Sequence, residues 1–313
     1  AEVSTRKAIK LNPNCTEAYS NLGIILKDLF RLQEAEVSTR EAIKLNPNCA
    51  EAHLNLGNIL KELGKFYDAI NSYTKAIKLK NNLSIAKTNL IESKGIICDW
   101  SNQNIEANWI DKLGIEGSSV CPGGLLYYED NPLKQLQRAK KLYKEKYYKK
   151  SNNISHSNNN KIRIGYFSSD FRAHPTMYLI TSLLKLHDKS KFEIYLYSFA
   201  PKEDKYTEIV KKSGCIFKDI KKLNYIEAVE LARNDQLDIA IDLMGYIKYN
   251  RMNIFSYRIA PIQINYLGYP GSLGADIMDY IIADNIIIPK EYEKFYSEKI
   301  IHMPSCYATN GHK

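Results

Sequence analysis

The sequence predicts two kinds of structure in one chain, tandem pairs of helices followed by an α/β domain with a parallel sheet. Two observations support this prediction. The first residues, AEVSTRKAIKLNPNC, recur almost unchanged from residue 35 as AEVSTREAIKLNPNC, which indicates a repeated unit. After residue 161 the repeat is absent, and short apolar runs alternate with helix-like runs. Apolar strands separated by helices are typical of a parallel sheet covered on both faces, as in Rossmann-like domains.

The helical repeats have a period of about 34 residues, which is the tetratricopeptide period. We expect the first helix of each pair at residues 16–29 and 50–63, and the second at residues 33–45 and 67–79. The third unit decays after Lys80, so we place the repeat domain at residues 1–93. A repeat buries its apolar face only against its neighbours, so we expect the array to continue upstream of residue 1.

One polar residue type recurs at the repeat period. Asn21, Asn55 and Asn89 each stand directly before a leucine on the first helix of a pair. A side-chain amide both donates and accepts hydrogen bonds, so a ladder of amides on a concave surface could hold the backbone of an extended peptide. We therefore interpret these three residues as a peptide-binding site. The alternative is that asparagine is simply tolerated on an exposed helix face in an Asn-rich chain.

The segment at residues 94–160 is expected to be a helical adaptor, with helix-like pieces at residues 104–113 and 133–148. Residues 151–160, SNNISHSNNN, are polar and low in complexity, so we expect a surface loop there. The third predicted domain is a Rossmann-like lobe at residues 161–313. The chain starts inside a repeat without an initiator methionine and stops without a clear ending, so we interpret it as a fragment of a longer protein.

The lobe contains seven strand-like segments with four helix-like segments between them. Strands are expected at residues 162–167, 192–198, 215–219, 237–243, 262–267, 278–283 and 299–303. Helices are expected at residues 177–187, 205–213, 226–234 and 251–257. This alternation predicts a parallel sheet with helices on both faces.

The stretch KIRIGYFSSDFRAHPT, residues 161–176, joins the first strand to the first of these helices. Proline is favoured at the first helical position, which places His174 near the N-cap, directly ahead of Pro175. His174 then lies at the carboxyl end of a strand, the edge where open α/β sheets bind ligands. Taken alone, the stretch fits an ordinary connection with a solvent-facing histidine equally well.

Two further strands are followed by glycine-containing loops, MGY at residues 244–246 and GYPGS at residues 268–272. The carboxyl ends of parallel strands meet at one edge of a sheet, so these loops and the His174 loop can converge on one crevice. Glycine also permits close approach of the backbone to a ligand. This convergence favours His174 as an active-site residue.

Composition and motifs narrow the class of function. The 313 residues include 44 Lys and Arg against 35 Asp and Glu, a net charge of +9. Much of the excess lies in KKLYKEKYYKK at residues 140–150, which we interpret as a solvated helix face, so no nucleic-acid partner is expected. No apolar run approaches the ~20 residues of a membrane span, so no membrane association is expected either.

The six cysteines lie far apart without a C-x-x-C pair, which disfavours a zinc site or a disulfide framework and fits a cytoplasmic protein. The histidines lack partners at metal-ligand spacing, so no metal is expected. No G-x-G-x-x-G follows the first strand, and neither a P-loop nor a G-x-S-x-G motif occurs. A dinucleotide site, a P-loop and an esterase are therefore not supported.

The order of motifs along the whole chain is distinctive: tetratricopeptide repeats, CDW, GYFSSDFRAHPT, DLMGY and APIQINYLGYPGSLGADIMDYIIAD. This order resembles the O-linked N-acetylglucosamine transferase and SPINDLY family. The resemblance implies a two-lobed glycosyltransferase B-type fold, of which this lobe is the first half. It also implies a metal-independent, inverting enzyme that moves a sugar from a nucleotide-sugar donor to Ser or Thr of proteins. UDP-N-acetylglucosamine is the donor we expect, with acceptor proteins or extended peptides as partners on the repeat arm.

The same resemblance implies roles for individual residues. His174 matches the family's essential active-site histidine, with Pro175 and Thr176 shaping its loop. Asp235 falls where the family has an aspartate once proposed as a base, although it precedes its strand. Tyr246 stands where many bacterial members have a histidine that contacts the substrate. The segment that approaches the sugar and the acceptor hydroxyl matches Leu267, Gly268, Tyr269 and Pro270. The family's peptide-holding ladder matches Asn21, Asn55 and Asn89.

The family binds most of the nucleotide diphosphate in a second lobe, whose residues would follow residue 313. We therefore expect the full-length protein to be the transferase and residues 1–313 alone to be inactive. One alternative is a tetratricopeptide scaffold that binds peptides without catalysis. Another is transfer of fucose in place of N-acetylglucosamine. The resemblance implies that the donor is selected mainly by the second lobe, so residues 1–313 do not discriminate between the two sugars.

Overall fold

The computed structural model describes residues 1–101, 108–149, 154–155 and 159–309. These residues form two compact units, Ala1–Asp130 and Asn131–Lys313, and each unit is considered by itself. In the part of the chain that is described, no helix combines the length and the apolar character needed to cross a membrane.

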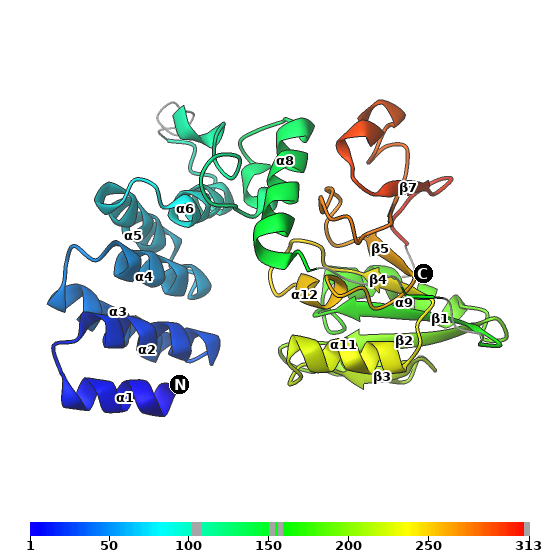
Figure 1. Ribbon diagram of the computed structural model, residues 1–313, viewed down its shortest axis with the longest axis horizontal. Helices are drawn as coiled ribbons and strands as arrows, with labels where there is room; N and C mark the ends of the chain where they lie inside the picture. Colours follow the sequence, from blue (N-terminus) through cyan, green and yellow to red (C-terminus); the bar gives the residue numbers. More distant parts are fainter. Residues whose placement is uncertain (102–107, 150–153, 156–158, 310–313) are drawn as a thin grey trace. The chain divides into compact units, whose positions relative to one another are not determined.

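The first unit consists of antiparallel helix pairs stacked in sequence order, coloured blue to cyan in Figure 1. The helices are α1 (Glu2–Leu11), α2 (Thr16–Asp28), α3 (Leu32–Leu45), α4 (Ala50–Glu62), α5 (Phe66–Leu79) and α6 (Ser84–Ile96), with a short 3-10 turn, η1 (Pro122–Leu125), near the end of the unit. These bounds confirm the predicted helix pairs to within a few residues. The predicted helix at residues 104–113 is only partly covered, because residues 102–107 lie outside the described ranges.

Small residues set the close packing of these helices. Ala35, Ala42, Ala69 and Ala76 are fully buried. A Cβ on Gly57 would lie 2.5 Å from the ring of Tyr73, so α4 and α5 approach each other more closely than an alanine would allow. Small residues that recur at the repeat period therefore let the two helices of a pair pack closely.

The second unit is a single parallel sheet with helices on both faces. Helix α8 (Pro132–Leu142) and a π-helical turn, η2 (Tyr143–Tyr147), come first, followed by the seven strands β1 (Ile162–Ser168), β2 (Phe192–Ser198), β3 (Ile216–Asp219), β4 (Ile239–Asp242), β5 (Ile262–Tyr266), β6 (Tyr280–Ala283) and β7 (Lys299–His302). The helices between them are α9 (Pro175–Leu186), α10 (Lys205–Lys211), α11 (Tyr225–Asn234), α12 (Met252–Phe255) and the 3-10 turn η3 (Lys290–Phe295). All seven predicted strands and the parallel sheet are confirmed. Most of the predicted loop at residues 151–160 lies outside the described ranges.

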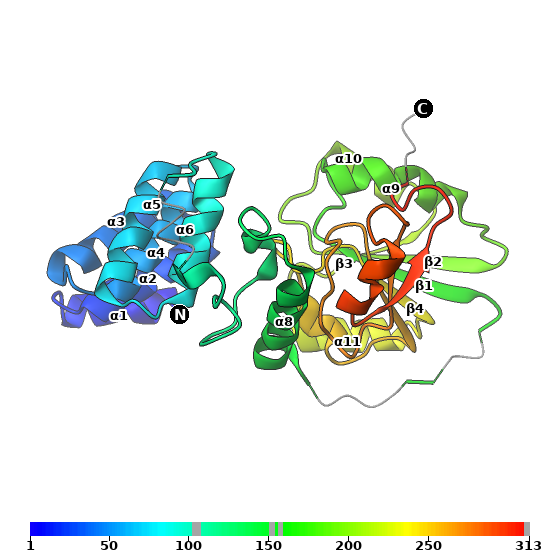
Figure 2. The same ribbon diagram turned by 90° about the horizontal axis from the view of Figure 1, so that it is seen from above.

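The two faces of the sheet are covered by different helices, as Figure 2 shows from above. Side chains at alternate positions of β1 face opposite ways. Ile164 and Tyr166 pack in the core with Met177 and Ile180 of α9. Phe167 faces the other side, with its ring 5.1 Å from that of Phe255 in α12. Both faces are apolar, which is why the strands read as nearly continuous apolar runs.

Two predicted helices are shorter than expected. The helix predicted at residues 251–257 is only α12, because Arg258 has a positive φ of 48° and its guanidinium pairs with Asp279. The helix predicted at residues 133–148 ends at Leu142 and continues as the π-helical turn η2.

Candidate active site

The strand order β3-β2-β1-β4-β5-β6-β7 has a switch point between β1 and β4. From β1 the chain builds outward through β2 and β3, and then returns to place β4 on the other side of β1. The connections after β1 and after β4 therefore leave the carboxyl edge of the sheet in opposite directions, and this is the position at which α/β sheets bind ligands. His174 follows β1, so the structure places it beside this switch point.

The loop that leads from β1 to His174 is held by side chains of its own and of the next connection. The backbone N–H of Asp170 donates to Ser168 Oγ at 2.9 Å. Thr207 Oγ1 donates to the carbonyl of Phe171 at 2.8 Å, and the N–H of Ala173 donates to Asp204 at 2.7 Å. Because Asp204 also caps α10, the loop is fixed to the helix that follows β2.

His174 is the N-cap residue of α9, with Pro175 in the first turn, which confirms its predicted position. Its side chain is about one third exposed, at 31%. Nδ1 lies 3.3 Å from the N–H of Thr176, 3.2 Å from Thr176 Oγ1 and 3.3 Å from Asp170 Oδ2. The inner nitrogen of the imidazole is thus engaged by three groups of the protein.

The loop after β4 is built around a fully buried carboxylate, that of Asp242. Oδ1 accepts from the N–H of Met244 at 2.9 Å, and Oδ2 accepts from the N–H of Gly245 at 3.0 Å. Burial raises the pKa of Asp242 to about 6 despite these two hydrogen bonds, which lower the pKa. Gly245 has a φ of +57°, and a Cβ there would lie 2.5 Å from Tyr269 Cβ, so this turn requires glycine.

The loop after β5 lies against the loop after β4. A Cβ on Gly268 would lie 2.1 Å from the carbonyl oxygen of Leu243. Asn265, in β5, donates from Nδ2 to the carbonyl of Tyr269 at 3.0 Å and so holds the turn against the end of its own strand. Leu267 has a φ of +71°, a conformation that L-residues adopt only under strain, and strained backbone is often found at functional sites.

Contacts on both sides of the β4 loop join the three loops. Ser168 Oγ and the N–H of Ser169 each lie 3.4 Å from Met244 Sδ, so the β1 loop contacts the β4 loop. The β4 loop in turn contacts Gly268. The predicted convergence of three loops at one sheet edge is confirmed, while the chemical roles of their residues stay predictions.

Tyr246 belongs to these loops but turns its side chain inward. It is 4% exposed, and its hydroxyl donates to the carbonyl of Leu273 at 2.6 Å. Its ring stacks on Tyr147 with centroids 5.9 Å apart. This placement supports the loop, and it leaves little of the side chain for the substrate contact that was predicted.

Asp235 lies at the opposite edge of the sheet. It follows α11, and its backbone carbonyl accepts from Arg163 at 3.1 Å, near the start of β1. Its carboxylate accepts from the Tyr197 hydroxyl at 2.6 Å and pairs with Lys218 at 2.8 Å. The seven residues of β1 span about 20 Å, which separates Asp235 from the edge that carries His174. We therefore correct the predicted catalytic role of Asp235 to a structural one.

Residues 133–313 match the model of glycosyl transferase family 41, and this match covers more than half of the chain. The chain belongs to glycosyl transferase family 41. Residues 16–49 and 50–83 each match a tetratricopeptide repeat model, which agrees with the helix pairs α2–α3 and α4–α5.

Curated relatives of this family 41 chain include two whose printed names state an activity. A probable UDP-N-acetylglucosamine–peptide N-acetylglucosaminyltransferase SEC of Arabidopsis thaliana is 34% identical over 154 residues, which are 49% of this chain and 16% of the relative. The UDP-N-acetylglucosamine–peptide N-acetylglucosaminyltransferase of Caenorhabditis elegans is 35% identical over 161 residues, 51% of this chain and 14% of the relative. The matched part of the chain thus spans about a sixth of the length of these relatives.

A mutant of the Thermobaculum terrenum O-GlcNAc transferase has a similar solved structure, with a TM-score of 0.64 and 23% identity. The similarity covers 98% of this chain and 54% of that one. It shows that the family 41 chain shares this fold.

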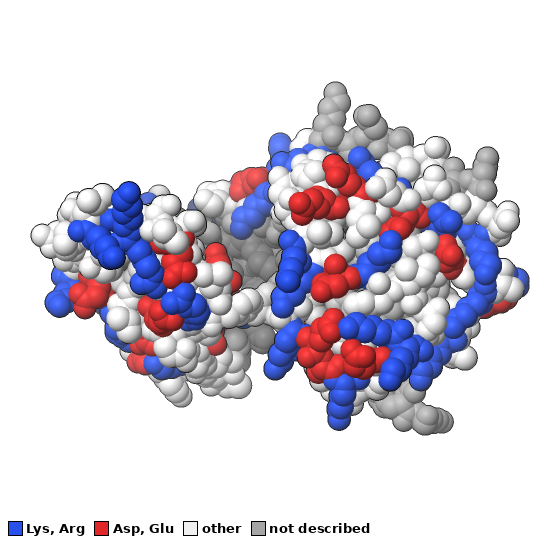
Figure 3. Space-filling model, turned by 90° about the horizontal axis from the view of Figure 1, so that it is seen from below, with Lys and Arg blue, Asp and Glu red and all other residues white. Residues whose placement is uncertain are grey.

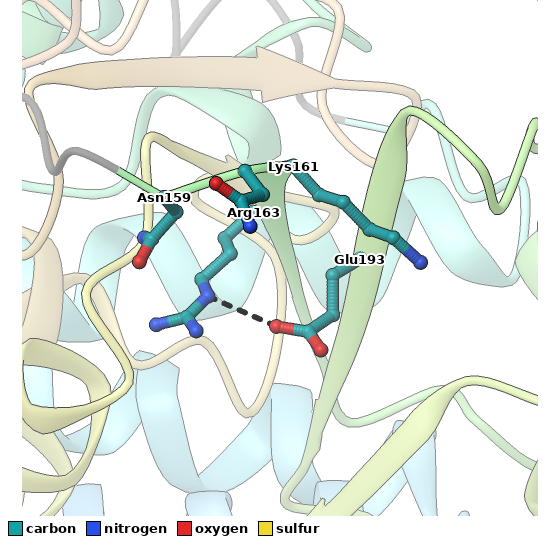
Figure 4. Close-up of a pocket in the computed structure, with 5 residues that line it drawn as sticks. Asn159, Lys161, Arg163 and Glu193 are labelled. Carbon is teal, nitrogen blue, oxygen red and sulfur yellow. Dashed lines mark ion pairs between the residues drawn. The ribbon is translucent and has the colours of Figure 1, made fainter.

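The described residues of the family 41 lobe also form a cavity of about 370 Å³ at the amino end of β1 and β2, shown in Figure 4. It is lined by Asn159, Asn160, Lys161, Arg163 and Glu193. Arg163 Nε forms an ion pair with Glu193 at 2.9 Å, so two of the charged side chains that line the cavity neutralise each other. This cavity lies at the sheet edge opposite His174 and is separate from the three loops.

The repeat asparagines of the family 41 chain lie on α2, α4 and α6 as predicted. Asn21 is exposed, whereas Asn55 and Asn89 are half-buried. Asn55 Nδ2 donates to Ser20 Oγ at 3.0 Å, and Asn89 Nδ2 donates to Asn58 Oδ1 at 2.8 Å. Two of the three amides therefore link successive repeats, in addition to any role in peptide binding.

Sequence reasoning missed Asp170 and Asp242. Both follow or end an apolar strand, and both are almost fully buried. An aspartate at the end of a strand that precedes a loop was the available signal, but aspartate is common in turns. Charged groups elsewhere are dispersed: Figure 3 shows Lys and Arg side chains interspersed with Asp and Glu on the visible face of each unit.

Proposed function

We propose that the full-length protein containing this chain transfers N-acetylglucosamine from UDP-N-acetylglucosamine to Ser or Thr hydroxyls of proteins, with inversion and without a metal. One observation supports this most: in a family 41 lobe, the His174 loop, the β4 loop and the β5 loop meet at the switch point of the sheet. The printed names of the curated relatives agree with this activity.

In this reaction the hydroxyl oxygen of the acceptor forms a bond to the anomeric carbon while the bond from that carbon to the diphosphate breaks. The hydroxyl proton passes to a base, and negative charge develops on the diphosphate. His174 is the base in this proposal, because its imidazole is partly exposed at the crevice. The first turn of α9, which contains Pro175 and Thr176, presents the helix N-terminus to that negative charge.

The remaining loop residues form the wall for the sugar and the acceptor. Leu267 and Gly268 contribute their backbone to this wall in the proposal; both residues are partly exposed, and Pro270 is exposed. Tyr269 and Tyr246 are buried and hold this wall in shape. Close positioning of the two reactants is the main contribution of such a wall.

The acceptor protein lies along the repeat unit in this proposal. Asn21, Asn55 and Asn89 lie on the corresponding helices of three successive pairs, one repeat apart. Amides at a regular spacing bind the peptide backbone, which is common to all acceptors, so the arm would accept many sequences. The matches to tetratricopeptide models are consistent with this role.

The test is transfer of radiolabelled sugar to protein by the full-length gene product, with His174→Ala as the variant. We expect label from UDP-N-acetylglucosamine to enter protein, and we expect His174→Ala to reduce the rate by about 10²-fold or more. Because His174 also caps α9 and lies against Asp170, the urea unfolding of this variant is compared with that of the wild type as a control for its fold. Absence of transfer by the wild type, or incorporation of activated fucose in its place, would refute the proposed donor. Full activity of His174→Ala would refute the role of the histidine.

A further inference from the structure

Asp170 is a buried carboxylate directly behind His174. Its side chain is 4% exposed. Oδ1 accepts from Ser169 Oγ at 3.0 Å and lies 3.5 Å from Arg172 Nη2. Oδ2 makes no hydrogen bond among the described residues, and the polar group that it faces is His174 Nδ1, at 3.3 Å. One oxygen of the carboxylate is therefore satisfied, and the other depends on whether the imidazole carries a proton at Nδ1.

The two neutral tautomers of His174 satisfy this site differently. With the proton on Nε2, Nδ1 accepts from the N–H of Thr176 at 3.3 Å, and the buried Oδ2 of Asp170 faces a lone pair. With the proton on Nδ1, the imidazole N–H faces Oδ2 of Asp170 at 3.3 Å and Oγ1 of Thr176 at 3.2 Å, and the N–H of Thr176 loses a long hydrogen bond at the start of a helix. A buried charged oxygen without a donor costs more than an unpaired N–H in a first helical turn, which water commonly satisfies.

We propose that Asp170 is a positioning residue that holds the proton of His174 on Nδ1 and so leaves Nε2 as the proton acceptor. This inference rests on the proposed transferase function. As the acceptor oxygen bonds to the anomeric carbon and the carbon–diphosphate bond breaks, the hydroxyl proton moves to Nε2. The resulting imidazolium then donates from Nδ1 to the carboxylate of Asp170, which stabilises its positive charge. The proton leaves to solvent after the product departs.

Ser169 and Arg172 complete the arrangement, because both act on Oδ1 and leave Oδ2 for the histidine. The same division of labour, a buried carboxylate that fixes the tautomer of a histidine base, occurs in serine proteases, where replacing that aspartate by asparagine lowers kcat by about 10⁴-fold. Asp204, the N-cap residue of α10, is a second carboxylate that contacts this loop, but it accepts from the N–H of Ala173 and does not face the imidazole. It provides a matched control.

The kinetic test uses the full-length protein with Asp170→Asn, Asp204→Asn and His174→Ala. We expect Asp170→Asn to lower kcat by about 10²-fold or more while KM for the donor stays within about threefold. Combined with His174→Ala, Asp170→Asn is expected to have no further effect, because it acts through the imidazole. A wild-type kcat in Asp170→Asn would overturn the inference. So would a loss of kcat on adding Asp170→Asn to His174→Ala that equals its loss in the wild type, or a similar loss of kcat in Asp204→Asn at unchanged stability.

A second measurement does not depend on activity. Nitrogen NMR of the full-length protein with ¹⁵N-labelled histidine reports which ring nitrogen carries the proton, and His174→Gln assigns the signal. We expect the Nδ1–H tautomer in the wild type and in Asp204→Asn, and a shift toward Nε2–H in Asp170→Asn. An Nε2–H tautomer in the wild type would refute the inference even if the enzyme transfers sugar. The expected tautomer in an inactive wild type would support the Asp170 contact and refute the transferase function.

Discussion

At Gly268 the loop after β5 passes directly over the end of β4, and this contact provides a sharp test of the site. A Cβ on Gly268 would lie 2.1 Å from the carbonyl oxygen of Leu243, 2.9 Å from its carbonyl carbon and 3.2 Å from Met244 Cα. All three are backbone atoms, so no side-chain rotation relieves the clash. We therefore expect Gly268→Ala to lower the free energy of unfolding of the second unit by about 3 kcal/mol, the upper part of the range for overpacking.

The two units can be observed separately because both tryptophans, Trp100 and Trp109, lie in the first unit. In urea titrations, tryptophan fluorescence reports the repeat unit, and far-UV circular dichroism reports both units. With a urea slope of about 1–3 kcal/mol per molar, a loss of 3 kcal/mol moves the midpoint of the second unit down by about 1–3 M. We expect the fluorescence transition of Gly268→Ala to stay in place.

Gly124→Ala is the control for adding a methyl group. A Cβ on Gly124 would lie 3.4 Å from Thr88 Cγ2, which is an ordinary contact. The reasoning is refuted if Gly268→Ala shifts the dichroism transition no more than Gly124→Ala does, or if only its fluorescence transition moves. In the full-length protein, a displacement of the Gly268 loop by about 1 Å is expected to reduce the rate of sugar transfer by about 10²-fold, measured with the radiolabelled donor.

Two further predictions concern buried polar groups. Burial raises the pKa of Asp242 to about 6, above its value in the unfolded chain, so the folded state binds more protons between about pH 4 and pH 6. Titration of Asp242 therefore lowers the free energy of unfolding of the second unit by about 3 kcal/mol as the pH rises through that window. Urea unfolding of the wild type and of Asp242→Asn at each pH should show this step as a change in the difference between their free energies of unfolding. A pH-independent difference would contradict it. Tyr73 is fully buried, and its hydroxyl donates to Asn58 Oδ1 at 3.0 Å. Tyr73→Phe should therefore lower the free energy of unfolding of the repeat unit by about 1 kcal/mol, measured by the fluorescence transition. Tyr67→Phe, at an exposed site, should not, and equal effects of the two variants would contradict a stabilising role of the contact.

The fold was largely predictable because its signals are local. The repeat period predicted the helix pairs, and the apolar runs predicted the strands, most clearly for the inner strands such as β1 and β4, which are largely buried. The failures came where a distant residue decides the local structure. Arg258, which follows α12, pairs through its guanidinium with Asp279, 21 residues further along the chain, and no pattern within residues 251–257 reveals that partner.

The site was predictable in its outline and not in its chemistry. His174 stood out because Pro175 follows it and a strand precedes it. Asp170 did not stand out, since an aspartate in a turn is ordinary until its burial and its unpaired oxygen are known. Tyr246 was assigned to the substrate from its place in a motif, although its hydroxyl is already used by Leu273. Burial and the direction of a side chain depend on tertiary packing, which a one-dimensional pattern does not contain.

Strand order explains why the loops form one site at all. If the strands lay in chain order, β1 and β4 would be separated by two strands, and their carboxyl ends would be about 14 Å apart at the usual spacing of about 4.8 Å. Ser169 could not then contact Met244 Sδ, and the chain of contacts from His174 to Gly268 would be broken. Because β4 instead pairs directly with β1, Phe167 and Asp242 are partners in register, and the loops that follow them begin side by side. The switch point, which no single motif encodes, is therefore what brings three ordinary strand ends into contact at one edge of the sheet.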